Sequence, residues 1–82
     1  MNNSFYNDFA VRFAATTLTS LVESFNSQVG NRGFTSVRAA HDKALIDELV
    51  RRGIDVSAVF DGTAISFAHH VELDNNSLVI RK

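Results

Sequence analysis

The chain has 82 residues, enough for one domain, which we expect to span residues 1–82. It contains no cysteine, which excludes disulfides, thiol catalysis and thiolate zinc sites. Hydrophobic residues make up 45% and charged residues 21% of the chain, a balance typical of globular and not of disordered proteins. Neither a signal peptide nor an apolar run of about 20 residues is present, so we expect a cytoplasmic protein with no membrane partner.

The first predicted helix runs from about Phe5 or Asp8 to about Gln28. Apolar residues recur along it at spacings of three and four, which is typical of one buried helix face. These residues are Val11, Ala14, Leu18, Leu21, Val22, Phe25 and Val29. Gly30 then provides a left-handed stop, and residues 31–33 are expected to make the connecting turn.

The second predicted helix runs from about Val37 to Arg52 and is capped by Thr35 or Ser36. The residues expected on its core side are Leu45, Ile46, Leu49 and Val50. The pair Gly53-Ile54 is typical of a C-terminal cap with an apolar contact.

The remaining residues predict strands. Residues 54–60 and 65–73 alternate in polarity, and Asp61-Gly62 between them is a favoured two-residue turn. Asn75-Asn76 is expected to make a second tight turn, because asparagine tolerates a positive φ. Leu78 and Ile80 follow on the last strand.

The two turns fix registers that agree with each other. Leu73 is expected opposite Leu78 and Val71 opposite Ile80, while the first turn sets Ala58 opposite Ile65. Both registers put apolar side chains on one face, which the helices would cover. The predicted class is therefore α+β, with two N-terminal helices on a C-terminal antiparallel β-meander and hairpin (a two-layer ααβββ sandwich).

An alternative makes residues 55–60 a short helix. The chain would then have three helices plus a C-terminal hairpin and would resemble a winged helix-turn-helix in outline only.

Aromatic residues form a second apolar side on the first predicted helix. Phe5, Tyr6, Phe9 and Phe13 cluster roughly opposite the face that contains Leu18, Leu21 and Phe25. One helix with two apolar sides is more than a lone small domain readily buries. We therefore predict that these four aromatic residues contact a partner protein, most simply a second copy of the chain. The competing interpretations are that they pack on the chain's own β-region, or that the helix breaks near Arg12.

A mildly basic segment between residues 32 and 52 suggests a second partner class. If the chain binds nucleic acid, the residues expected to contact phosphate are Arg32, Arg38, Arg51 and Arg52. The alternative interpretation is a solvated helix surface.

Motifs for metal binding or catalysis are weak. His69 and His70 are adjacent on a predicted strand, so they would point to opposite faces and could not share an ion; His69 is expected to be partly buried on the apolar face. Ser66 and Asp74 would each lie four residues, about 13 Å, from His70 on that strand's outer face, too far for a catalytic triad. We expect no metal, no cofactor and no enzymatic activity.

The predicted function is that of a small non-enzymatic protein–protein interaction module that self-associates through its first helix. The alternative is a nucleic-acid-binding accessory protein that uses the basic segment.

Overall fold

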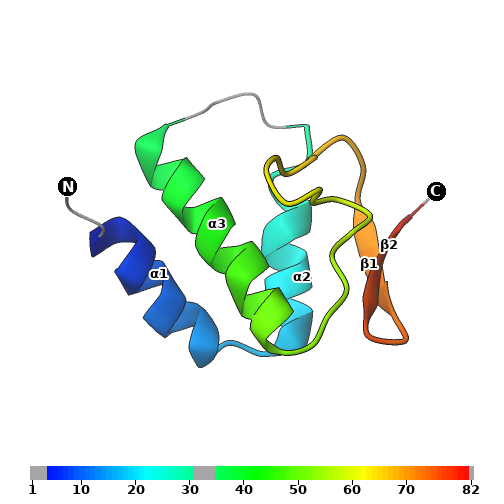
Figure 1. Ribbon diagram of the computed structural model, residues 1–82, viewed down its shortest axis with the longest axis horizontal. Helices are drawn as coiled ribbons and strands as arrows, with labels where there is room; N and C mark the ends of the chain where they lie inside the picture. Colours follow the sequence, from blue (N-terminus) through cyan, green and yellow to red (C-terminus); the bar gives the residue numbers. More distant parts are fainter. Residues whose placement is uncertain (1–3, 31–34, 82) are drawn as a thin grey trace.

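The computed structural model describes residues 4–30 and 35–81 (Figure 1). Within them the chain forms α1 (Ser4–Ala14), α2 (Leu18–Asn26) and α3 (Ser36–Arg51), followed by an antiparallel hairpin of β1 (Val71–Asp74) and β2 (Ser77–Ile80). The class is α+β, with helices packed on a hairpin. None of the helices described here is long and apolar enough to cross a membrane.

The first predicted helix is two helices, and the prediction of one continuous helix was wrong. Thr17 has extended backbone angles, and its side-chain oxygen accepts a hydrogen bond from the Ser20 amide at 3.2 Å, so that Thr17 caps α2. The neighbouring Thr16 donates its hydroxyl to the Arg12 carbonyl oxygen at 2.8 Å. These threonine hydroxyls offer the backbone an alternative to helix continuation, because short hydroxyl side chains compete for its hydrogen bonds.

Helix α3 confirms the boundaries of the second predicted helix. Thr35 caps its start by accepting from the Arg38 amide at 3.1 Å. At its end Gly53 has a φ of 82°, and the Ile54 amide donates to the Leu49 carbonyl at 3.0 Å. This pattern is a Schellman motif, which needs the positive φ that glycine adopts freely. Val50 departs from expectation, since it is 52% exposed instead of facing the core.

Helix α3 is the central element. It packs against α1 on one flank and against α2 on the other, and β1 packs on α2 (Figure 1). One apolar core joins the three helices to the segment after α3 and to the hairpin. Its buried residues are Phe13, Leu21, Phe25, Ala44, Leu45, Ile46, Leu49, Ile54, Val56, Val59, Val71 and Leu78.

The first of the three predicted strands, over residues 54–60, is absent. The backbone there makes a turn at residues 57–59, and its pairing is limited to single bridges at Asp55 with Ser77 and at Phe60 with Ile65. Because Phe60 faces Ile65, the loop holds residues 61–64, and the predicted pairing of Ala58 with Ile65 was wrong. No meander forms here. The short helix of the alternative is also absent, and the third helix arises from the break after α1.

The terminal hairpin is confirmed, including its register. Leu73 pairs with Leu78 and Val71 with Ile80. Asn75 and Asn76 have φ values of 54° and 65°, the left-handed pair that a two-residue hairpin turn requires. The strand before the turn is shorter than the predicted 65–73, because it begins at Val71.

A side chain from α2 holds the hairpin in place. The Asn26 amide nitrogen donates to the Val71 carbonyl at 2.9 Å, and the Val71 N–H donates to Asn26 Oδ1 at 2.8 Å. Asn26 thereby satisfies the outer edge of β1 in the way a neighbouring strand would.

Candidate functional site

The four aromatic residues predicted to contact a partner are divided between the interior and the surface. Phe13 lies in the core and is 5% exposed, and Phe9 and Tyr6 are partly buried against that core. Phe5 is 51% exposed. These four residues, which we call the aromatic stripe, thus pack mainly on α3 and not on the β-region, and Phe5 is the exposed member.

His41 of α3 lies between two rings of the stripe. Its ring centroid is 5.0 Å from that of Phe9 and 5.2 Å from that of Phe13, both edge-on. The Arg12 guanidinium stands over the Phe9 ring at 5.7 Å from its centroid. These contacts fix α1 on α3 by aromatic packing.

Tyr6 belongs to a second cluster on the same two helices. Its hydroxyl donates a short hydrogen bond to Asp47 Oδ2, and Lys43 Nζ lies 2.6 Å from Asp47 Oδ1. The hydrogen bond to Asp47 raises the pKa of Tyr6. Burial would raise the pKa of Asp47, but hydrogen bonds from Lys43 and Tyr6 lower it overall. Tyr6 and Asp47 therefore stay respectively neutral and charged near pH 7.

This cluster lines a shallow hollow of about 450 Å³ between α1 and α3. Its lining residues are Tyr6, Ala39, Ala40, Lys43 and Asp47, which we call the α1–α3 face. The two alanines have short side chains, so this face is nearly flat. The ion pair gives it one charge of each sign.

The basic residues predicted to contact nucleic acid largely make hydrogen bonds and ion pairs within the chain. Arg38 Nε donates to Gln28 Oε1 at 2.8 Å, and Arg52 binds backbone carbonyls at the end of α1. Arg51 is the exposed one of the three, with its side chain 64% accessible, and it pairs with Glu48. Arg32 lies outside the described residues. The positions of Arg38 and Arg52 give little support to a phosphate-binding row.

Arg52 joins α3 to the break between α1 and α2. One of its terminal nitrogens (Nη2) lies 2.8 Å from the Phe13 carbonyl oxygen and 2.5 Å from that of Thr16. Its Nε donates to Glu48 Oε2 at 2.6 Å. The guanidinium thus binds the Phe13 carbonyl, which also accepts from the Thr16 N–H at 3.0 Å, and the Thr16 carbonyl in the turn after α1.

Glu48 is the buried acid of this junction, with its side chain 5% exposed. Hydrogen bonds from Arg51, and then from Arg52, outweigh the effect of burial and lower the pKa of Glu48 from the ordinary 4.5 to about 2. A carboxyl with a depressed folded-state pKa stabilises the fold fully above its unfolded pKa, and this contribution is lost as the pH falls through the folded pKa.

We therefore expect acid to weaken the fold between about pH 4.5 and pH 2 through Glu48. After allowance for solvent screening at the partly exposed arginines, the loss is about 1–2 kcal/mol in the free energy of unfolding. Urea unfolding at a series of pH values would measure it. The variant Glu48→Gln should show a flatter pH dependence over this window; equal slopes in both proteins would contradict the assignment.

Sequence reasoning missed a polar cluster between α3 and the turn after α2. Gln28 and Asp42 are buried at 8% and 5% exposure, and both contact the His41 ring. His41 Nδ1 is 3.1 Å from Gln28 Nε2 and 3.1 Å from Asp42 Oδ1. The adjacent pair His41-Asp42 is visible in the sequence, but the contribution of Gln28 depends on the path of the chain between the helices.

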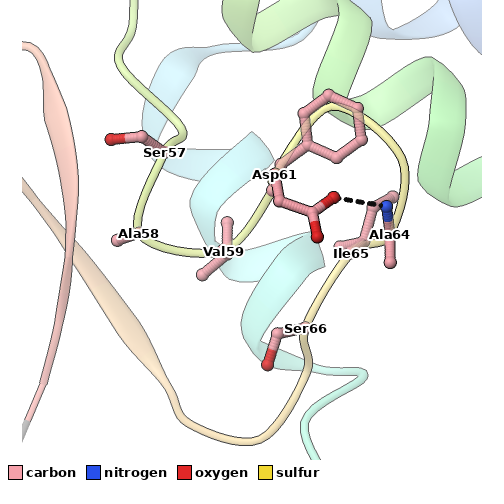
Figure 2. Close-up of a pocket in the computed structure, with 8 residues that line it drawn as sticks. Ser57, Ala58, Val59, Asp61, Ala64, Ile65 and Ser66 are labelled. Carbon is pink, nitrogen blue, oxygen red and sulfur yellow. Dashed lines mark hydrogen bonds between the residues drawn. The ribbon is translucent and has the colours of Figure 1, made fainter.

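The loop of residues 57–66 forms a smaller hollow of about 230 Å³ (Figure 2). Asp61 points to the Ala64 amide, and its carboxylate accepts from that amide at 2.8 Å (Figure 2). It also accepts from the Thr63 amide at 2.8 Å. These backbone hydrogen bonds, that from Ala64 first, lower the pKa of Asp61. The carboxylate holds the turn, and Ser57 and Ser66 stand apart at the two ends of the loop (Figure 2).

The histidines near the hairpin do not form a metal site. His69 and His70 are both exposed, so the expectation that His69 is partly buried was wrong. They precede β1, where the chain is not yet a strand and has no apolar face to turn His69 into. Among residues 4–30 and 35–81, no three His, Cys, Asp or Glu side chains are grouped to hold an ion.

Comparison of the chain with protein-family models, with curated proteins and with solved structures gave no match.

Proposed function

We propose that this chain is a small non-enzymatic interaction module that self-associates through the α1–α3 face. The observation that carries the proposal is the shallow hollow that is lined by Tyr6, Ala39, Ala40, Lys43 and Asp47. Small side chains let a second helix approach closely, as ridge-into-groove packing requires. Compared with the interface expected from the sequence, this contact keeps Tyr6 but moves from the aromatic stripe to α3.

The charges on this face favour a second copy as the partner. Lys43 and Asp47 are one helical turn apart, and their side chains are 56% and 37% exposed. If two α3 helices pack antiparallel about a two-fold axis with Lys43 of one copy opposite Asp47 of the other, the reciprocal pair forms as well. The face is therefore complementary to itself in charge.

The same register gives a place to an exposed apolar side chain. It sets Val50, which is 52% exposed, opposite Ala40 of the second copy, where the hollow is lined by small side chains. A branched side chain that fills a gap over alanine gains contact area at little steric cost. Association through a face this small is expected to be weak, because stable interfaces bury about 1,200 Å² or more.

The variant Val50→Glu should weaken self-association by at least about tenfold, which corresponds to about 1.4 kcal/mol. A carboxylate at this position would be buried against Ala40 of the second copy without a partner. Sedimentation velocity over a wide concentration range would measure the effect. For the unaltered protein we expect the weight-average mass to rise above that of one chain, 9.0 kDa, as the concentration increases.

The matched control is Val11→Glu. Val11 is 74% exposed and lies about 140° around α1 from Tyr6, at about 100° per residue, so the same substitution there should leave association unchanged. A charge swap adds a second test: Lys43→Glu should weaken association, and adding Asp47→Lys should restore it. A protein that stays monomeric throughout, or equal effects of the two valine variants, would contradict the proposal.

A further inference from the structure

A ring nitrogen of His41 lies between two groups that cannot both bind it in one protonation state. Nδ1 is 3.1 Å from the Gln28 side-chain nitrogen and 3.1 Å from Asp42 Oδ1. An amide nitrogen donates, so it needs the lone pair of an unprotonated Nδ1. A carboxylate accepts, so it needs a proton on Nδ1.

The orientation of the Gln28 amide is fixed by its other partner. Arg38 Nε donates to Gln28 Oε1 at 2.8 Å, and a guanidinium has no acceptor. The amide oxygen must therefore face Arg38, which leaves the NH₂ group facing His41. Arg38 also donates to the Gln28 backbone carbonyl at 3.3 Å, so the turn after α2 is attached to α3 through two side chains.

We propose that His41 is a proton-operated latch between the turn after α2 and α3. With a neutral ring that carries its proton on Nε2, Nδ1 accepts from Gln28 and the latch is closed. When the ring takes up a proton from water, Nδ1–H donates to Asp42, and the Gln28 NH₂ group loses its acceptor. The turn then keeps its attachment through Arg38 and loses the one through His41.

The surroundings of His41 allow this exchange. The ring is 25% exposed, which gives protons access, while the Asp42 side chain is 7% exposed. Among the described residues, the charged groups that face it from α3 are Asp42 and Arg38, which lies 3.6 Å from Asp42. From α1, Arg12 lies over the Phe9 ring that contacts His41. The turn after α2 contributes the neutral Gln28. None of these contacts belongs to the α1–α3 face, so the latch does not depend on self-association.

NMR spectroscopy of the ¹⁵N-labelled full chain at low concentration would test the latch. On acidification, the His41 ring nitrogens should change from the Nε2–H tautomer to the charged form. The Gln28 side-chain amide signals should shift with the same midpoint. His69 and His70, which are exposed, serve as internal references.

The variant His41→Phe keeps a ring between Phe9 and Phe13 and removes the nitrogen. In this variant the Gln28 amide signals should be independent of pH. The latch is wrong if the unaltered protein shows the Nδ1–H tautomer at high pH, or if the Gln28 amide does not respond as His41 titrates. If His41→Phe fails to fold, the tautomer and the Gln28 shifts of the unaltered protein still decide between these outcomes.

Discussion

Replacing Arg52 with alanine should lower the free energy of unfolding by about 2–4 kcal/mol. The side chain binds the Phe13 and Thr16 carbonyls and the buried Glu48 at once. Its removal takes one donor from each of these two carbonyls and reduces the neutralisation of a carboxylate that is 5% exposed. Because both losses fall where α1 meets α3, amide protection in α1 should fall together with global stability. Urea unfolding and hydrogen exchange would measure the two effects.

Arg51→Ala is the matched control, because Arg51 pairs with the same Glu48 but is 64% exposed and, among residues 4–30 and 35–81, makes no hydrogen bond to α1. We expect its loss to cost much less than the loss of Arg52, because an exposed ion pair contributes little to stability. Arg52→Lys should fall between the two, since an ammonium can neutralise Glu48 but does not reproduce the planar fork of a guanidinium. Equal losses for Arg51→Ala and Arg52→Ala would show that the carbonyl contacts contribute nothing.

The role of Arg52 illustrates why part of this structure could not be predicted from the sequence. An arginine at the end of a helix is compatible with phosphate contact, dipole stabilisation or an internal bond, and the choice depends on which segment returns to it. The segment that returns is the end of α1, which could be anticipated only from the Thr16-Thr17 break. The apolar repeat continues through that break, and so it favours one long helix.

The break also accounts for the two apolar sides of the first predicted helix. Once the chain turns at residues 15–17, Phe9 and Phe13 pack on one flank of α3, while Leu21 and Phe25 of α2 lie in the core on its other flank. The aromatic residues that suggested a partner are thereby largely buried within the chain. The case for self-association consequently shifts to the charge pattern and low relief of α3.

Features governed by neighbouring residues were predicted well. The hairpin register follows from the left-handed preference of Asn75-Asn76 and from the alternation on either side of it. The end of α3 follows from Gly53-Ile54. The prediction of a strand over residues 54–60 was wrong, because alternating polarity does not show whether a second strand is available for pairing. The Asp61 carboxylate accepts hydrogen bonds from the amides of Thr63 and Ala64. The resulting turn is wider than the predicted two-residue turn at Asp61-Gly62.

Asn26→Ala should detach the hairpin from α2 and lower the free energy of unfolding by about 2 kcal/mol. Alanine removes both the donor to the Val71 carbonyl and the acceptor from its N–H, and Val71 is 1% exposed, so water cannot readily replace them. Hydrogen exchange should show faster exchange in β1 and β2 than in α3, because the loss is confined to the hairpin joint.

Glu23→Ala is the matched control, since Glu23 is exposed, lies on the same helix and, together with Asn26, lines a hollow between α2 and β1. We expect it to change stability by less than about 0.5 kcal/mol. Asn26→Asp separates the two hydrogen bonds: its carboxylate still accepts from the Val71 N–H but cannot donate to the carbonyl, and it sets a charged oxygen against it. It should therefore be no more stable than Asn26→Ala at neutral pH and should recover as acid protonates the carboxyl. Unchanged hairpin exchange in Asn26→Ala would mean that apolar packing of Val71 and Leu78 alone holds the hairpin on α2.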